Sequence, residues 1–150
     1  MSTLKSQLHT DLTTAMKARD ELTTATIRML LTAVTNEEVA GSTARELSDD
    51  EVLKVIGREA KKRREAAEAF ADGNRPEQAQ RERDEETVLA RYLPAQLTDE
   101  ELASLVAQAI TEAGATEQRQ MGLVMKAVQP AIAGRADGKR VSDEVRRQLS

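Results

Sequence analysis

Apolar residues recur at intervals of three and four positions along almost the whole chain, and no segment shows the polar–apolar alternation typical of a β-strand. The pattern therefore predicts an all-α protein of about seven helices. The first two helices are expected to form a hairpin, with Asp20 as the N-cap of the second. Their apolar positions are Leu4, Leu8, Leu12, Ala15 and Met16 in the first helix and Leu22, Ala25, Met29, Ala33 and Val34 in the second.

Residues that cap or break a helix mark the boundaries of the next elements. Ser48 and Thr98 are each followed by a glutamate three positions later, the spacing of a capping box, and they predict the starts of the third and fifth helices. The third helix is expected to run to about Phe70, and Gly73 to end it in the left-handed conformation. Pro76 suits the first turn of the fourth helix. The predicted buried stripe of the third helix is Val52, Val55, Ile56, Ala60, Ala67 and Phe70.

A domain boundary is predicted at Pro94, because proline disfavours helical geometry in the residue before it. Residues 1–94 would form N-terminal helical hairpins of about four helices, the last running to about position 93. Residues 95–150 would form a small C-terminal domain of three helices. In that domain, Gly114 is expected to end the fifth helix and Pro130 to interrupt the sixth.

The composition leaves few side chains for covalent or proton-transfer chemistry. The chain has no Cys and no Trp, and it has one residue each of His, Tyr and Phe. His9 has no second histidine and no acidic cluster at ligand spacing near it. We therefore predict no catalytic residue, no metal site and no cofactor, and we favour binding over catalysis. Without a signal-peptide core or a run of ~20 apolar residues, the expected location is cytoplasmic, with no membrane partner.

Charge is distributed unevenly along the chain, whose net charge is -4. Residues 134–150 contain five cations and three acids, a net charge of +2, which leaves -6 for residues 1–133. A local basic patch on an acidic body suits selective docking on a phosphate backbone better than indiscriminate binding to polyanions.

The basic patch begins with the segment 134–140, in which two glycines and three cations precede a helix predicted to start at Ser142. The segment is no nucleotide triphosphate loop: Gly134 is one residue too close to Gly138, and Arg140 replaces the required Ser or Thr. Flexible glycines, cations and helix N-terminal amides can still hold one phosphate of a nucleic acid. A turn with solvated charges is the alternative. The candidate nucleic-acid-binding residues are Gly134, Arg135, Gly138, Lys139, Arg140, Arg146 and Arg147.

A second basic run comprises Arg58 and residues 61–64. In a hairpin that turns near Gly73, this run would face acids between positions 82 and 86. We favour mutual neutralisation across that hairpin over nucleic-acid binding, because charge runs usually solvate a helix face.

Aromatic residues are too few to stack the bases of a single-stranded RNA, since Phe70 and Tyr92 are both expected in the core. RNA would instead be recognised through its backbone and shape, as a folded tRNA permits. Three phosphate contacts, by Arg135, Lys139 and Arg140, would make the logarithm of the binding constant fall with the logarithm of the salt concentration with a slope of about -2.7. Binding would then weaken roughly 40-fold between 50 and 200 mM salt.

Several short motifs together resemble those of the GatB/YqeY family, over nearly the whole chain. Each motif alone is weak, but their combination is specific. The matching stretches are Ala15–Asp20, Ile27–Leu31, Lys61–Glu65, Tyr92–Leu97, Met121–Met125 and Gly134–Gly138, together with Phe70 and Arg75.

The resemblance implies a free-standing, two-domain helical protein. Its C-terminal domain would be similar to the tail of the B subunit of the tRNA-dependent amidotransferase, which helps to hold tRNA while catalysis occurs elsewhere. Two positions depart from the family pattern, because Gln120 and Leu123 stand where Asp and Lys are usual.

Three functions follow as hypotheses. The first is a tRNA-binding accessory protein related to tRNA-dependent amidotransferase, without catalysis of its own. The second is a protein-interaction module that docks on a translation enzyme, such as an aminoacyl-tRNA synthetase or an amidotransferase. The third, implied by kinship only, is a carbon–nitrogen ligase with glutamine as amido donor.

Overall fold

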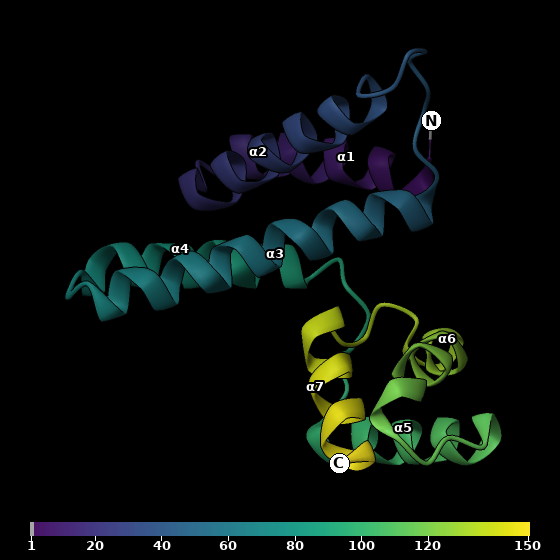
Figure 1. Cartoon of the computed structure of the whole chain (residues 1–150). Helices are drawn as coiled ribbons and strands as arrows, with labels where there is room; N and C mark the ends of the chain where they lie inside the picture. The colour runs from purple at the N-terminus through teal and green to yellow at the C-terminus, as the bar shows by residue number, and fades with distance from the viewer. Residues whose placement is uncertain (1) are drawn as a thin grey trace. The chain divides into compact units, whose positions relative to one another are not determined.

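The computed structural model describes residues 2–150, and these residues form seven α-helices, one short 3-10 helix and no strand (Figure 1). The prediction of an all-α protein is confirmed. The elements are α1 (Thr3–Lys17), α2 (Glu21–Glu38), α3 (Asp49–Asp72), α4 (Pro76–Ala90), α5 (Asp99–Ala113), η1 (Gln118–Gln120), α6 (Met121–Ile132) and α7 (Gly138–Leu149).

The chain divides into two compact units, one that ends at Leu93 and one that spans Pro94–Ser150. Each unit has its own apolar core. The core of the first unit consists of Leu8, Ile27, Leu30, Val34, Leu47, Val52, Val55, Ile56, Ala60, Val88 and Leu89. The core of the second consists of Leu97, Leu102, Val106, Ala109, Ala115, Val124, Val128, Ile132, Ala136, Val141, Val145 and Leu149.

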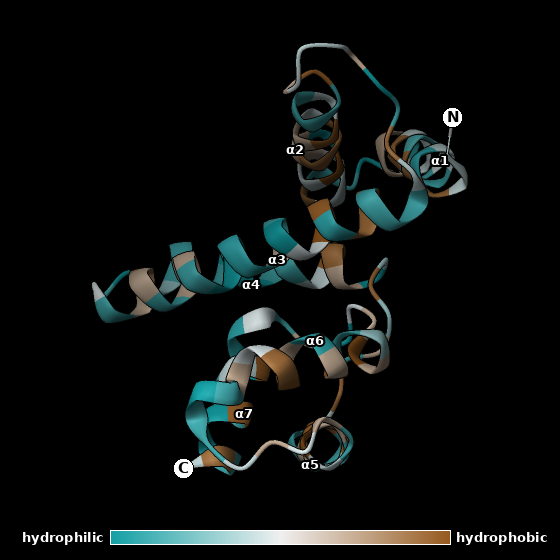
Figure 2. Ribbon diagram, turned by 45° about the vertical axis from the view of Figure 1, so that its right-hand side comes forward, coloured by the Kyte–Doolittle hydropathy of each residue, from teal (hydrophilic) through white to brown (hydrophobic). Residues whose placement is uncertain are grey.

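Two helical hairpins make up the first unit. Helices α1 and α2 pair across a short turn, where the side chain of Asp20 accepts a hydrogen bond from the amide of Thr23 as the predicted N-cap. Helices α3 and α4 pair along their length, and this hairpin is largely hydrophilic in Figure 2. The hydroxyl of Tyr92 donates to Asp11 Oδ2 at 2.5 Å, and burial together with this bond raises the pKa of the phenol. This contact ties the segment after α4 to α1.

The turn between α3 and α4 corrects one prediction. Helix α3 ends at Asp72, but Gly73 has a φ of -81° and is not left-handed. The left-handed residue is Asn74, with a φ of 63°. Asparagine tolerates this conformation because its short polar side chain can bond locally, so the chain turns one residue later than expected. Pro76 occupies the first turn of α4, as predicted.

The buried face of α2 also differs from the one that the apolar spacing indicated. Ile27, Leu30 and Val34 are almost fully buried, whereas Met29 is 40% exposed. The buried face is completed by the polar residues Thr23 and Thr26. A threonine can be buried in a helix because its hydroxyl donates to the backbone, as that of Thr26 does to the carbonyl of Leu22 at 2.8 Å. The period of apolar residues alone therefore selected a face that is rotated from the true one.

Capping residues delimit the helices of the second unit. Thr98 and Glu101 form the predicted capping box of α5, and Gly114 ends that helix in the left-handed conformation. The prediction that Pro130 interrupts α6 is wrong, because the helix continues to Ile132. A proline in the last turn removes only one hydrogen bond, and the side chain of Ile132, 2% exposed, packs in the core.

The last helix starts earlier than predicted. Asp137, and not Ser142, is the N-cap of α7, and its carboxylate accepts from the amide of Arg140 at 2.8 Å. Ser142 lies inside the helix and donates to the carbonyl of Lys139 at 3.1 Å. Residues 138–140 are therefore the first turn of α7 and not part of a flexible loop.

Candidate nucleic-acid interface

The turn between α6 and α7 is held by the backbone. Ala133 and Gly134 are both left-handed, with φ values of 46° and 78°, and they reverse the chain after α6. The carbonyl of Arg135 then accepts a hydrogen bond from the amide of Leu97 at 2.8 Å. This bond fixes the turn to the segment that precedes α5, so the predicted flexible glycine loop is an ordered corner.

Two of the three cations predicted to contact phosphate donate to groups within the second unit. The guanidinium of Arg135 donates to the carbonyls of Ala131 at 2.6 Å and Ile132 at 3.3 Å, and it closes the end of α6. The guanidinium of Arg140 donates to the carbonyl of Leu97 and to Asp99 Oδ1, each at 3.0 Å. Both side chains have structural partners, which a phosphate would have to displace.

The N-terminus of α7 does not offer a free anion site either. Asp137 places its own carboxylate against the first-turn amides, where an external phosphate would otherwise bind. The positions of Arg146 and Arg147 in the last turn suit the helix dipole, and each pairs within α7. Arg146 pairs with Asp143 at 3.2 Å, and Arg147 pairs with Glu144, whose pKa is lowered by this hydrogen bond.

Lys139 differs from the other cations of the patch. Within residues 2–150, its ammonium makes no ion pair or hydrogen bond, and the residue is exposed. It lies in the first turn of α7, where the helix dipole disfavours a cation by about 0.3–1 kcal/mol. A cation at such a position is not explained by helix stability, and it remains available to an anion from outside.

Sequence reasoning missed a second available cation, Lys126 on α6. This side chain is exposed and has no partner in the described part of the chain. Helix α6 contains no aspartate or glutamate, a feature that is visible in the sequence and could have drawn attention to this helix. Gly122 lies one turn earlier, and a Cβ placed on it would meet nothing within 4 Å. Close helix packing therefore does not account for this glycine, but it lies in the first turn of α6, outside the helix interior where a glycine costs most.

The two positions that depart from the family pattern have clear local environments. The side-chain oxygen of Gln120 accepts from the amides of Thr116 at 2.7 Å and Glu117 at 3.1 Å, and it closes the turn before α6. Leu123 is 56% exposed and makes no core contact that would explain an apolar residue. The exposed surface of α6 therefore combines an open glycine, a leucine and an unpaired lysine.

The second basic run is neutralised partly as predicted. Arg63 and Arg64 lie 3.7 and 3.1 Å from Glu85 and Glu86 across the α3–α4 hairpin. The other three cations pair elsewhere: Arg58 with Glu37, Lys61 with Glu65 and Lys62 with Glu59. Carboxylates therefore approach every cation of the run, although only two of these contacts cross the hairpin that we considered.

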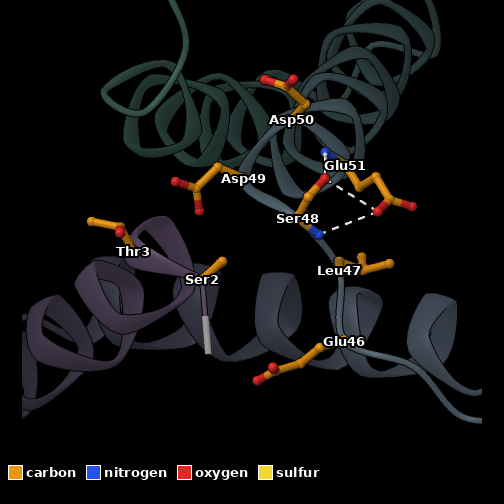
Figure 3. Close-up of a pocket in the computed structure, with 8 residues that line it drawn as sticks. All are labelled: Ser2, Thr3, Glu46, Leu47, Ser48, Asp49, Asp50 and Glu51. Carbon is orange, nitrogen blue, oxygen red and sulfur yellow. Dashed lines mark hydrogen bonds between the residues drawn. The ribbon is translucent and has the colours of Figure 1, made fainter.

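A hollow in the first unit is acidic, because Glu46, Asp49, Asp50 and Glu51 line it (Figure 3). It lies beside the starts of α1 and α3, where Asp49 accepts from the amide of Leu4 at 3.0 Å. Figure 3 also shows the capping box of Ser48 and Glu51, whose pKa is lowered by its hydrogen bond with Arg45. Asp49 and Glu51 accept hydrogen bonds at helix starts here, and the acidic lining repels an anionic ligand.

Other kinds of site find no support among residues 2–150. No group of three or more His, Asp or Glu side chains there is arranged to hold a metal ion. None of the helices that the structure describes combines the length and apolar content needed to cross a bilayer.

Comparisons with known proteins agree with the motifs along the chain. The family model described as Yqey-like protein matches residues 5–149. A curated relative from Clavispora lusitaniae, named altered inheritance of mitochondria protein 41, mitochondrial, is 29% identical over 134 residues, which cover 87% of this chain and 76% of the relative. Because the family model spans both units, the chain belongs to the YqeY-like family.

Proposed function

We propose that this protein is a tRNA-binding accessory protein, related to tRNA-dependent amidotransferase, that holds the backbone of a folded RNA on its second unit. The observation that carries the proposal is that Lys126 and Lys139 are exposed cations without a partner among residues 2–150. Family membership and the open position of Gly122 support it, because a missing side chain lets a phosphate backbone approach closely. Arg135 and Arg140 then stabilise the fold of the second unit and do not contact the RNA.

The number of available cations changes the expected strength of binding. Three phosphate contacts were expected from the sequence, but only two cations of the second unit lack a partner in the described part of the chain. Two contacts give a log–log salt slope near ~-1.8, so affinity should fall roughly 12-fold between 50 and 200 mM salt. Such binding is modest, and it suits a protein that works beside a larger RNA-binding partner.

The test is a titration of fluorescently labelled, folded tRNA at several salt concentrations, with duplex and unstructured RNA in parallel. Lys126→Ala and Lys139→Ala should each reduce the slope by about 0.9. Lys54→Ala is the matched control, since Lys54 is an exposed lysine of α3 without a partner among the described residues. The absence of any preference for folded tRNA, or an unchanged slope in both variants, would refute the proposal.

A second candidate function is docking on a protein partner, and one observation favours it. Leu123 is 56% exposed on the same helix, α6, where a lysine is usual in the family. A protein interface would use this side chain at its core, whereas a phosphate backbone would not. Leu123→Ser should therefore abolish salt-insensitive capture of an amidotransferase or synthetase and leave tRNA binding unchanged. Loss of tRNA binding in this variant would instead assign Leu123 to the RNA surface.

A further inference from the structure

A groove in the first unit is separate from the surface that we assign to RNA. It runs between α2 and α3. Arg28, Met29 and Ala33 line it from α2, and Glu59, Lys62 and Arg63 line it from α3. On each helix the lining residues lie within about one turn of each other, as with Met29 and Ala33 or Glu59 and Arg63, so each set shares one face.

The α2 side of the groove carries a methionine that lies outside the core. The core side of α2 is formed by Ile27, Leu30 and Val34. Met29 is 40% exposed, and its sulfur accepts a weak hydrogen bond from Arg63 Nη2 at 3.6 Å. Methionine is flexible and polarizable, and it adapts to the shape of a partner side chain. A partner could therefore cover this methionine without any change in the core.

Charge along the groove is opposite in sign to that of the unit around it. The first unit contains 15 basic and 18 acidic residues, a net charge of -3. The groove lining contains three cations and one carboxylate, a net charge of +2. The carboxylate of Glu59 is already engaged, at 3.0 Å from both Lys62 and Arg63. The lining therefore carries more positive charge than its single carboxylate neutralises.

Arg28 shows this surplus most clearly. Its guanidinium is exposed, and its hydrogen bond within the unit goes to the sulfur of Met16 at 3.7 Å. A thioether sulfur is a weak acceptor, whereas a guanidinium prefers a carboxylate. Met16 is itself 49% exposed. A partner in the groove can therefore reach Arg28 and, beside the groove, the methionine that Arg28 contacts.

These features favour a protein segment over a nucleic acid. An exposed methionine and an alanine gain from covering by apolar side chains, which a phosphate backbone does not supply. An amphipathic helix with acidic residues beside its apolar stripe matches both the shape and the charge of the groove.

We propose that the groove between α2 and α3 binds an acidic amphipathic helix of a partner protein. An aliphatic side chain of that helix packs against Met29 and Ala33, and flanking carboxylates pair with Arg28 and Lys62. This surface acts independently of the lysines of the second unit, so a partner protein and an RNA can each be held by a different unit.

The experiment uses the full chain labelled with 13C at its methionine methyl groups. The probe is a synthetic peptide of about four helical turns, with leucines along one face and glutamates beside them. The methyl signals of Met29 and Met16 should shift on titration, whereas those of Met121 and Met125, in the second unit, should stay in place. A peptide with glutamine in place of every glutamate is the first control.

Variants test the charge of the groove directly. Arg28→Glu combined with Lys62→Glu should weaken peptide binding about tenfold or more, since each exposed pair contributes up to roughly fivefold. Lys54→Glu combined with Arg83→Glu is the matched control, because both residues are exposed in the same unit and lie outside the groove. Circular dichroism of both double variants verifies that the helices are intact.

Four outcomes would overturn the proposal. Unmoved Met29 and Met16 signals would mean that the groove does not bind such a helix. Equal binding of the glutamine peptide would remove the role of charge. If an unstructured RNA oligonucleotide shifted the same two methyl signals, the groove would be a nucleic-acid site. Shifts that depend on protein concentration without peptide would assign it to a second copy of the chain.

Discussion

Removing the guanidinium of Arg140 distinguishes a structural role from the phosphate contact that the sequence suggested. In Arg140→Ala, the carbonyl of Leu97 loses a charged donor at 3.0 Å, a bond of a kind that contributes about 1.5–3 kcal/mol. The pair with Asp99 adds at most about 1 kcal/mol, because the side chain of Asp99 is 93% exposed. We expect the second unit to lose about 2 kcal/mol. For a domain of this size, that loss lowers the melting temperature by roughly 8–16 °C.

Thermal unfolding followed by far-UV circular dichroism measures this loss, and Asp99→Asn is the control. That variant removes the exposed ion pair but keeps the bond to Leu97, so its midpoint should move by less than half as much. The salt slope of tRNA binding, measured at a temperature where both variants are folded, should stay at its wild-type value. An unchanged melting temperature together with a reduced salt slope in Arg140→Ala would refute the structural role of the Arg140–Leu97 bond and would favour a phosphate contact instead.

Three further predictions concern single positions. Gly122→Ala should stabilise the protein by up to about 1 kcal/mol in urea unfolding, because the added Cβ meets no atom within 4 Å. The same variant should weaken tRNA binding, and unchanged binding would remove the argument from close approach. Asn74→Ala should lower the free energy of unfolding by about 1 kcal/mol, because alanine is strained at the φ of 63° that Asn74 adopts. Asn74→Gly should not lower it, and equal losses in urea unfolding of the two variants would show that the left-handed backbone is not the cause. Hydrogen bonds from Lys5 and from the amide of Leu47 hold the pKa of Glu38 below its ordinary value of 4.5. The stabilisation by this carboxylate is fully present above the pKa that Glu38 has in the unfolded chain, and it is lost as the pH falls through its lower pKa in the folded protein. When the free energy of unfolding is measured against pH, Glu38→Gln should therefore reduce the loss of stability at acidic pH.

The sequence supported the prediction of fold class because helical periodicity and caps are local. Ser48, Thr98 and Asp20 each bond to an amide only three residues away, so their role can be recognised without tertiary information. The same argument failed at Ser142, since Asp137, five residues nearer to α6, was a competing cap. Two plausible caps in one short segment cannot be ranked by local pattern alone.

Contacts between residues far apart in the sequence determine which basic side chains of the second unit are hydrogen-bonded inside the fold. Arg140 reaches the carbonyl of Leu97, 43 positions away, and the amide of Leu97 in turn reaches the carbonyl of Arg135. No local spacing encodes such contacts, because they exist only once α5, α6 and α7 have packed around their common core. The sequence therefore determined that the chain forms helices, where most of them begin, and to which family it belongs. Tertiary structure alone decided that Arg135 and Arg140 are internal donors and that Lys126 and Lys139 find no partner among residues 2–150, because a long cationic side chain bonds to whichever acceptor the fold brings within its reach.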